Sequence, residues 1–303
     1  MIKRAIVVAK FLVPLIVAFF IGRLIHGNWQ QVRGEDWRFE PVWLLASFLL
    51  TGWWFLIRPY VWGHLLRGFG HCLPYRESFH IIRRAELSRY VPGGVWQYLS
   101  RVYLAGQAGI PAGVCLMSTL VETVILMTAA LLPAFLYLSE TLPALERYQR
   151  GLLIAVPAAA FCAIHPKLLN FWAGFLARRF KQPHIRLTIH WKTMAAIWAV
   201  YVFTWAVLGL AVALFVRGVL DIPAEWMPRI GAHYAMAWLV GMVSMIAPAG
   251  MGIRDGMFGL LLEGLLPIGA AMALAVGVRL WLTLTELIWT FSGRWIFGHA
   301  RDS

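Results

Sequence analysis

Charged residues are scarce in this sequence. They make up 14% of the 303 residues, whereas 60% are hydrophobic and the mean hydropathy is +0.69. Soluble domains contain about 45–50% apolar and about 25% charged residues. So few charges cannot cover a surface in water, which excludes a soluble globular protein and predicts that lipid faces most of the chain.

Cysteines and common catalytic motifs are also few or missing. The three cysteines, Cys72, Cys115 and Cys162, are odd in number and widely spaced, so they predict no disulfide framework and no metal site. The sequence has no nucleotide-binding glycine loop after a strand, no HExxH and no GxSxG. We therefore expect no cofactor and no metal, and we do not expect an enzyme of these classes.

Acidic residues are about half as frequent as basic ones, with 14 Asp and Glu against 27 Lys and Arg, for a net charge of +13. In a soluble protein this excess would suggest nucleic acid. Here most basic residues lie in short loops beside apolar runs, where they set membrane topology. No nucleic-acid partner is predicted.

Long apolar runs predict an all-α polytopic membrane protein, because a membrane helix needs roughly 20 apolar residues. Six spans are predicted, at residues 5–25, 41–66, 112–138, 145–165, 193–216 and 268–293. The first begins like a signal peptide but has no small-residue cleavage pattern, so we expect it to be retained. Two further apolar stretches, 85–110 and 231–265, are interrupted by Pro and Gly.

The loops alternate between basic and neutral along the chain. The N-terminus, the loops 67–89 and 165–192 and the tail are basic, whereas 23–40, 140–150 and 217–229 are neutral. The positive-inside rule then predicts a multi-pass protein of the bacterial cytoplasmic (inner) membrane with both termini cytoplasmic. Each interrupted stretch must cross the membrane either not at all or twice, as a re-entrant hairpin or as two short full spans.

The even number of crossings in each interrupted stretch predicts one transmembrane domain, residues 1–303, made of two inverted repeats with pseudo-halves 1–143 and 144–303. Each half would hold three spanning helices and one Pro-Gly-interrupted re-entrant hairpin. A spacing of 19 residues recurs in the two halves, from Pro92 to Pro111 and from Pro248 to Pro267. Inverted repeats with broken helices near the midplane are a transporter architecture.

Eight ionisable residues lie inside apolar segments: Arg58, Arg101, Glu122, Arg254, Asp255, Glu263, Arg279 and Glu286. A charge at the bilayer centre costs on the order of 2.5–3.5 kcal/mol on insertion scales. Such residues face a cavity or a partner. Equal numbers of acids and bases also allow the alternative of four structural ion pairs.

Arg254 is the strongest candidate for binding a ligand. It follows a turn containing Pro248, Gly250 and Gly252, whose glycines allow close backbone approach and whose amides can bind an anion. The planar guanidinium binds phosphate bidentately. Adjacent helical residues do not face each other, so we expect Arg254 and Asp255 to have different partners.

Arg101, nine residues after Pro92, is the first-half counterpart of Arg254, and its turn contains Gly93 and Gly94. Glu122 lies near mid-membrane depth and could accept a proton or pair with Arg101.

Arg279 and Glu286 are seven residues apart on one helical face, so both could line one cavity. Arg279 could equally be a structural partner for Asp255 or Glu286. Arg58 and Glu263 are expected to snorkel or lie near an interface.

Two stretches resemble the signatures of the lysylphosphatidylglycerol synthase transmembrane, or flippase-like, family. The first is Ser88-Arg89-Tyr90-Val91-Pro92-Gly93-Gly94-Val95-Trp96, followed by Arg101 and Gly109-Ile110-Pro111. The second is Pro248-Ala249-Gly250-Met251-Gly252-Ile253-Arg254-Asp255, where the usual pattern is Pro-Gly-Gly-x-Gly-x-Arg-Glu. Glu122 and Arg279 resemble further positions of the family. Ala249 and Asp255 depart from its pattern.

The resemblance covers essentially the whole chain, but not the aminoacyl-transferring domain of two-domain members, so no lysyl-lipid synthesis is expected. It implies a lipid flippase or transporter that moves an anionic phospholipid or a polyprenyl-phosphate-linked lipid. One alternative is a membrane enzyme or accessory subunit acting on polyprenyl-phosphate lipids in envelope glycan synthesis, and another is a scaffold for a glycosyltransferase. The expected partners are membrane lipids, with a homo-oligomer or an envelope glycosyltransferase as further candidates.

Overall fold

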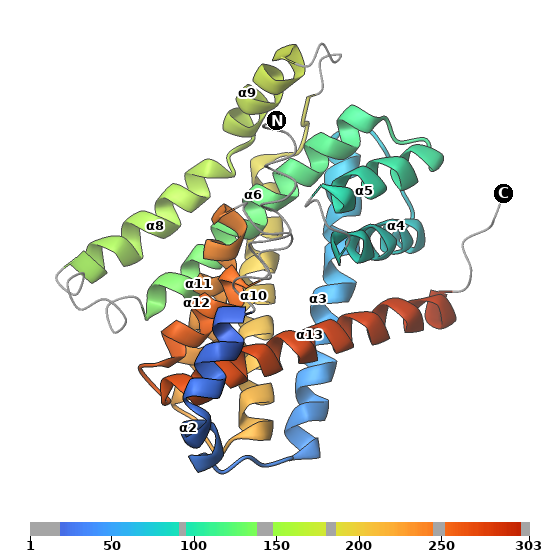
Figure 1. Cartoon of the computed structure of the whole chain (residues 1–303). Coiled ribbons are helices and arrows are strands. Elements are labelled where there is room, and N and C mark those ends of the chain that lie inside the picture. The colour runs from blue at the N-terminus through green and yellow to red at the C-terminus, as the bar shows by residue number, and fades with distance from the viewer. Residues whose placement is uncertain (1–18, 91–94, 138–147, 180–185, 245–251, 298–303) are drawn as a thin grey trace, which may run out of the picture.

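The computed structural model describes residues 19–90, 95–137, 148–179, 186–244 and 252–297. Within these ranges the regular structure is helical, apart from an isolated bridge between Trp37 and Leu220 (Figure 1). The predicted all-α class is confirmed.

Among the residues that the structure describes, four helices are long and apolar enough to cross a membrane: α3 (Pro41–Gly68), α6 (Ala112–Leu136), α10 (Trp191–Val219) and α13 (Ile268–Phe297). They match four of the six predicted spans. Most of the span predicted at 5–25 lies outside the described residues, although residues 19–27 are helical.

The span predicted at 145–165 corresponds to a helix that ends at a sharp bend of the chain. Helix α8 (Gln149–Ala163) is followed by α9 (Pro166–Arg179), and the two together form a candidate broken span with an angle of 59°. The break falls at His165-Pro166, because proline has no N–H to donate and disfavours helical geometry in the residue before it.

Shorter helices complete the fold: α2 (Trp29–Gly34), α4 (Tyr75–Leu87), the 3-10 turn η1 (Ser88–Tyr90), α5 (Trp96–Gln107), α11 (Trp226–Ser244) and α12 (Ile253–Leu262). The order α3–α4–α5–α6 therefore has the same pattern as α10–α11–α12–α13, with shorter helices between two long ones. This order agrees with a repeat. The inverted relation of the halves and their re-entrant hairpins stay predictions.

Helices from the two halves pack side by side. Helix α3 lies along α10 (Figure 1), where Ser47 Oγ donates a hydrogen bond to the Ala211 carbonyl at 2.6 Å. Trp281 Nε1 of α13 donates to the same Ser47 hydroxyl at 3.0 Å. A Cβ added to Gly209 of α10 would lie 3.1 Å from the Gly231 Cα of α11. Small residues at such crossings let membrane helices approach closely.

The loop predicted at 67–89 is instead largely helix α4. Its residues Phe79, Ile82, Arg83 and Glu86 are buried. Two of these are charged, and they form an ion pair that permits their burial, with Arg83 Nη2 2.7 Å from Glu86 Oε2. Two charges counted as loop charges therefore belong to the interior.

Candidate functional site

A cavity of about 120 Å³ lies between the two halves of the molecule, and arginines from five elements line it. They are Arg58 of α3, Arg89 of η1, Arg101 of α5, Arg254 of α12 and Arg279 of α13. A second cavity of about 70 Å³ shares Arg89, Arg254, Arg279, Trp54 and Trp238 with the first. The two cavities therefore adjoin one another and form one region of the site.

Glu122 organises one end of this region. Its carboxylate accepts hydrogen bonds from Arg101 Nη2 at 2.7 Å, from Tyr201 Oη at 2.9 Å and from Arg58 Nε at 3.3 Å. Glu122 is only 1% exposed. Of its two predicted roles, the pairing with Arg101 is the one that the structure contains.

Glu86 is the second carboxylate at this end, and it forms ion pairs with Arg58 and Arg83. It lies on α4, outside the candidate spans. Burial alone would raise the pKa of this carboxyl, but the neighbouring Arg58, Arg83 and Arg89 lower it more, so the pKa falls below its ordinary value. Glu86 is therefore a carboxylate at neutral pH.

At the other end, Arg89 forms an ion pair with Glu286 of α13, which is 1% exposed. Glu286 and Arg279 both line the second cavity, as their seven-residue spacing predicted.

Asp255 closes the start of α12. The Gly252 N–H donates to Asp255 Oδ2 at 3.2 Å, and Gly252 has a φ of +81°, which an L side chain rarely adopts. Arg254 Nη2 lies 3.3 Å from Asp255 Oδ1. The prediction of different partners for these neighbours was wrong, because the Asp255 carboxylate contacts both Gly252 at the helix start and the Arg254 guanidinium.

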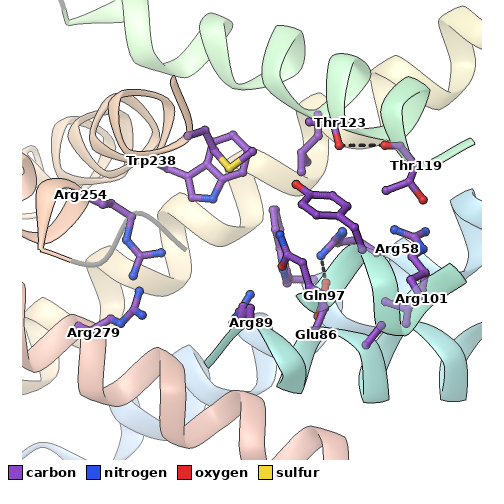
Figure 2. Close-up of a pocket in the computed structure, with 16 residues that line it drawn as sticks. Arg58, Glu86, Arg89, Gln97, Arg101, Thr119, Thr123, Trp238, Arg254 and Arg279 are labelled. Carbon is purple, nitrogen blue, oxygen red and sulfur yellow. Dashed lines mark hydrogen bonds and ion pairs between the residues drawn. The ribbon is translucent and has the colours of Figure 1, made fainter. Parts of the chain in front are cut away.

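Figure 2 shows Arg254 and Arg279 pointing toward one another from α12 and α13, with Arg58 and Arg101 at the opposite end of the cavity. Within the described ranges, no hydrogen bond or ion pair joins Arg279 to another residue. Asp255 contacts Arg254, and Glu286 contacts Arg89, and in the described residues neither carboxylate forms a direct ion pair with Arg279.

The structure brings together most of the predicted site. Arg101, Arg254 and Arg279 line the cavity, and Glu122, Asp255 and Glu286 contact its arginines or line the adjoining space. Five predicted residues lie outside the described residues: Pro92, Gly93, Gly94, Pro248 and Gly250.

Arg58 was expected to snorkel or to lie near an interface, and its side chain does not snorkel. Its side chain is 13% exposed and lies between Glu86 and Glu122, because two buried carboxylates offer it a better partner than the interface. Glu263 is exposed, and its position near an interface stays a prediction.

The sequence did not predict five further residues of this region, namely Arg89, Glu86, Trp54, Trp238 and Tyr201. Arg89 was present in the first signature stretch, so the resemblance could have marked it. The two Trp residues and Tyr201 lie in uniformly apolar runs, where the sequence carries no signal of which face meets a cavity.

These features define an all-helical, multi-pass membrane protein with an arginine-lined cavity between its halves. The family model described as lysylphosphatidylglycerol synthase TM region matches residues 6–289, and the chain belongs to this family. No curated protein and no solved structure matches the chain.

Proposed function

We propose that this chain is a lipid flippase or transporter that moves an anionic phospholipid or a polyprenyl-phosphate-linked lipid across the bacterial inner membrane. The observation that carries this proposal is the convergence of five arginines on one cavity between the halves. Arginine is the side chain best suited to bind phosphate at several points. The family is lipid-related, which supports the same cargo class.

The cargo would enter with its head group alone. A cavity of about 120 Å³ has room for a phosphate group. The acyl or prenyl chains of the cargo would stay in the bilayer while the arginines hold the phosphate.

Translocation is favoured over chemistry on the lipid by the state of the carboxylates. Glu86, Glu122, Asp255 and Glu286 each form an ion pair with an arginine. A general acid or base must be within hydrogen-bond reach of the reacting group, whereas these carboxylates already contact arginine side chains.

Reconstitution into liposomes tests the proposal. The purified chain is incorporated with a fluorescent anionic lipid, and both transfer between leaflets and the chemical identity of the lipid are followed. Transfer of an unchanged lipid supports a flippase. A new lipid product without transfer would support the enzyme alternative, and neither activity would support a scaffold.

A further inference from the structure

The ionisable side chains around the two cavities do not balance. Six are arginines, Arg58, Arg83, Arg89, Arg101, Arg254 and Arg279, and four are carboxylates, Glu86, Glu122, Asp255 and Glu286. Arginine stays protonated in proteins. Six positive and four negative charges give this part of the described chain a net charge of +2. The neighbouring segments 91–94 and 245–251 contain no ionisable residue that could offset it.

The excess is shared between the two ends of the cavity. At the α3–α6 end, Arg58, Arg83 and Arg101 face Glu86 and Glu122. At the α12–α13 end, three arginines likewise face two carboxylates: Arg89, Arg254 and Arg279 against Asp255 and Glu286. Each end therefore carries one positive charge that its own carboxylates leave uncompensated.

The excess charge at the second end has a visible location. Arg254 and Arg279 point toward one another (Figure 2), although like charges repel. Within the described ranges, Arg279 has no ion pair of its own. Charges in an enclosed site are costly unless they are paired. An anion held between these two guanidinium groups would remove both the repulsion and the uncompensated charge.

Resting on the proposed function, we propose that this cavity selects a lipid head group with two negative charges, a phosphate monoester or a diphosphate. A phosphate monoester carries about −1.5 to −2 charges at pH 7. A phosphodiester, which has a single charge, would leave one guanidinium without a counter-charge. The size of the cavity is compatible with this ligand, since it has room for phosphate groups.

A matched pair of ligands tests this selectivity. Farnesyl phosphate and its methyl ester share the prenyl chain and differ by one methyl group and one charge. Titration calorimetry on the full chain in detergent should show farnesyl phosphate binding at least tenfold more tightly than the ester. Equal affinity for the two would overturn the proposal.

Inorganic phosphate and pyrophosphate identify the source of the head group. If they bind much more weakly than farnesyl phosphate and farnesyl diphosphate, the ligand is a lipid. If inorganic phosphate binds as tightly as farnesyl phosphate, the site belongs to a free anion, and the lipid part of the proposal is wrong.

The substitution Arg279→Gln links the selectivity to the charge count. It removes one of the two excess charges, so the preference for farnesyl phosphate over its ester should fall to within about twofold. The unliganded protein should melt at the same or a higher temperature, because a repelled charge is lost. A variant that keeps a tenfold preference would show that Arg279 does not set it.

Arg217→Gln is the matched control. Arg217 is also a partly buried arginine in a long helix, but it stacks over Trp43 with its guanidinium 4.9 Å from the ring, away from the cavity. This variant should keep the preference.

Failure of the two proposals can be told apart, because binding in detergent does not require transport. A chain that prefers farnesyl phosphate but moves no lipid would keep this inference and lose the flippase. A chain that moves lipid but binds both ligands equally would keep the flippase and lose this inference.

Discussion

Arg89 and Glu286 form an ion pair across 197 residues of sequence, joining the turn after α4 to the middle of α13. Glu286 is almost fully buried, and Arg89 lines both cavities. The pair therefore connects the first half of the molecule to the last helix at the place where the proposed cargo would bind.

Removing this connection should destabilise the fold. Breaking a buried ion pair by removing one partner costs about 3–5 kcal/mol. We expect Glu286→Gln to lower the free energy of unfolding by that amount in a denaturant titration of the detergent-solubilised protein. The double variant Arg89→Gln/Glu286→Gln should be less destabilised than the sum of the single variants. Additivity within about 0.5 kcal/mol would show that the two side chains are not coupled.

Glu122 should be at least as sensitive, because three donors from α3, α5 and α10 meet on its carboxylate. Glu122→Gln keeps the shape but removes the charge that Arg58 and Arg101 face. A loss of about 3–5 kcal/mol is expected from the same titration.

The exposed Glu263 provides the control for Glu122. Glu263→Gln should change the free energy of unfolding by no more than about 0.5 kcal/mol. If both variants behave alike, the hydrogen-bond network around Glu122 does not stabilise the protein.

The contact between α10 and α11 predicts a steric effect with no change of charge. Gly209→Val would force a side chain toward Gly231, whose Cα would lie 3.1 Å from the new Cβ. Overpacking typically costs about 1–3 kcal/mol. Gly151→Val is the control, because nothing lies within 4 Å of a Cβ at that position. Similar melting temperatures for the two variants would contradict the close approach of these helices.

The predicted topology has its own test. A version with Cys72, Cys115 and Cys162 replaced by serine receives Leu145→Cys, and intact cells are treated with a membrane-impermeant thiol reagent. The alternating loop charges predict labelling from the outside. Labelling only after the cytoplasmic face is opened would reverse the orientation and move both termini outside.

The apolar runs predicted the long helices well, because bilayer thickness fixes how many apolar residues a span needs. They did not predict that α9 would follow the helix of the 145–165 span at an angle of 59°, because a hydropathy pattern does not show in which direction the chain continues.

The sequence located the charged residues of the site better than it located their partners. It marked Arg254 and Arg279 by their cost at membrane depth, and the structure places both in the cavity. It could not assign Arg58 to Glu86, because α4 reads as a basic loop until its buried face is seen. Pairing depends on which helices meet, and a single sequence does not contain that information.

The most direct test of the central claim is the rate at which Arg254→Ala moves a labelled anionic lipid in proteoliposomes. A charge-assisted contact is worth about 1.5–3 kcal/mol, so loss of Arg254 should weaken cargo binding roughly ten- to a hundredfold. Arg254→Lys should restore only part of it, because lysine lacks the guanidinium fork.

Thermal stability is measured on the same preparations, with Arg217→Ala as the control that should transport normally. We expect a folded Arg254→Ala protein whose transport at limiting lipid is at least tenfold slower than that of the unaltered chain. A folded Arg254→Ala protein with an unchanged rate would contradict this expectation.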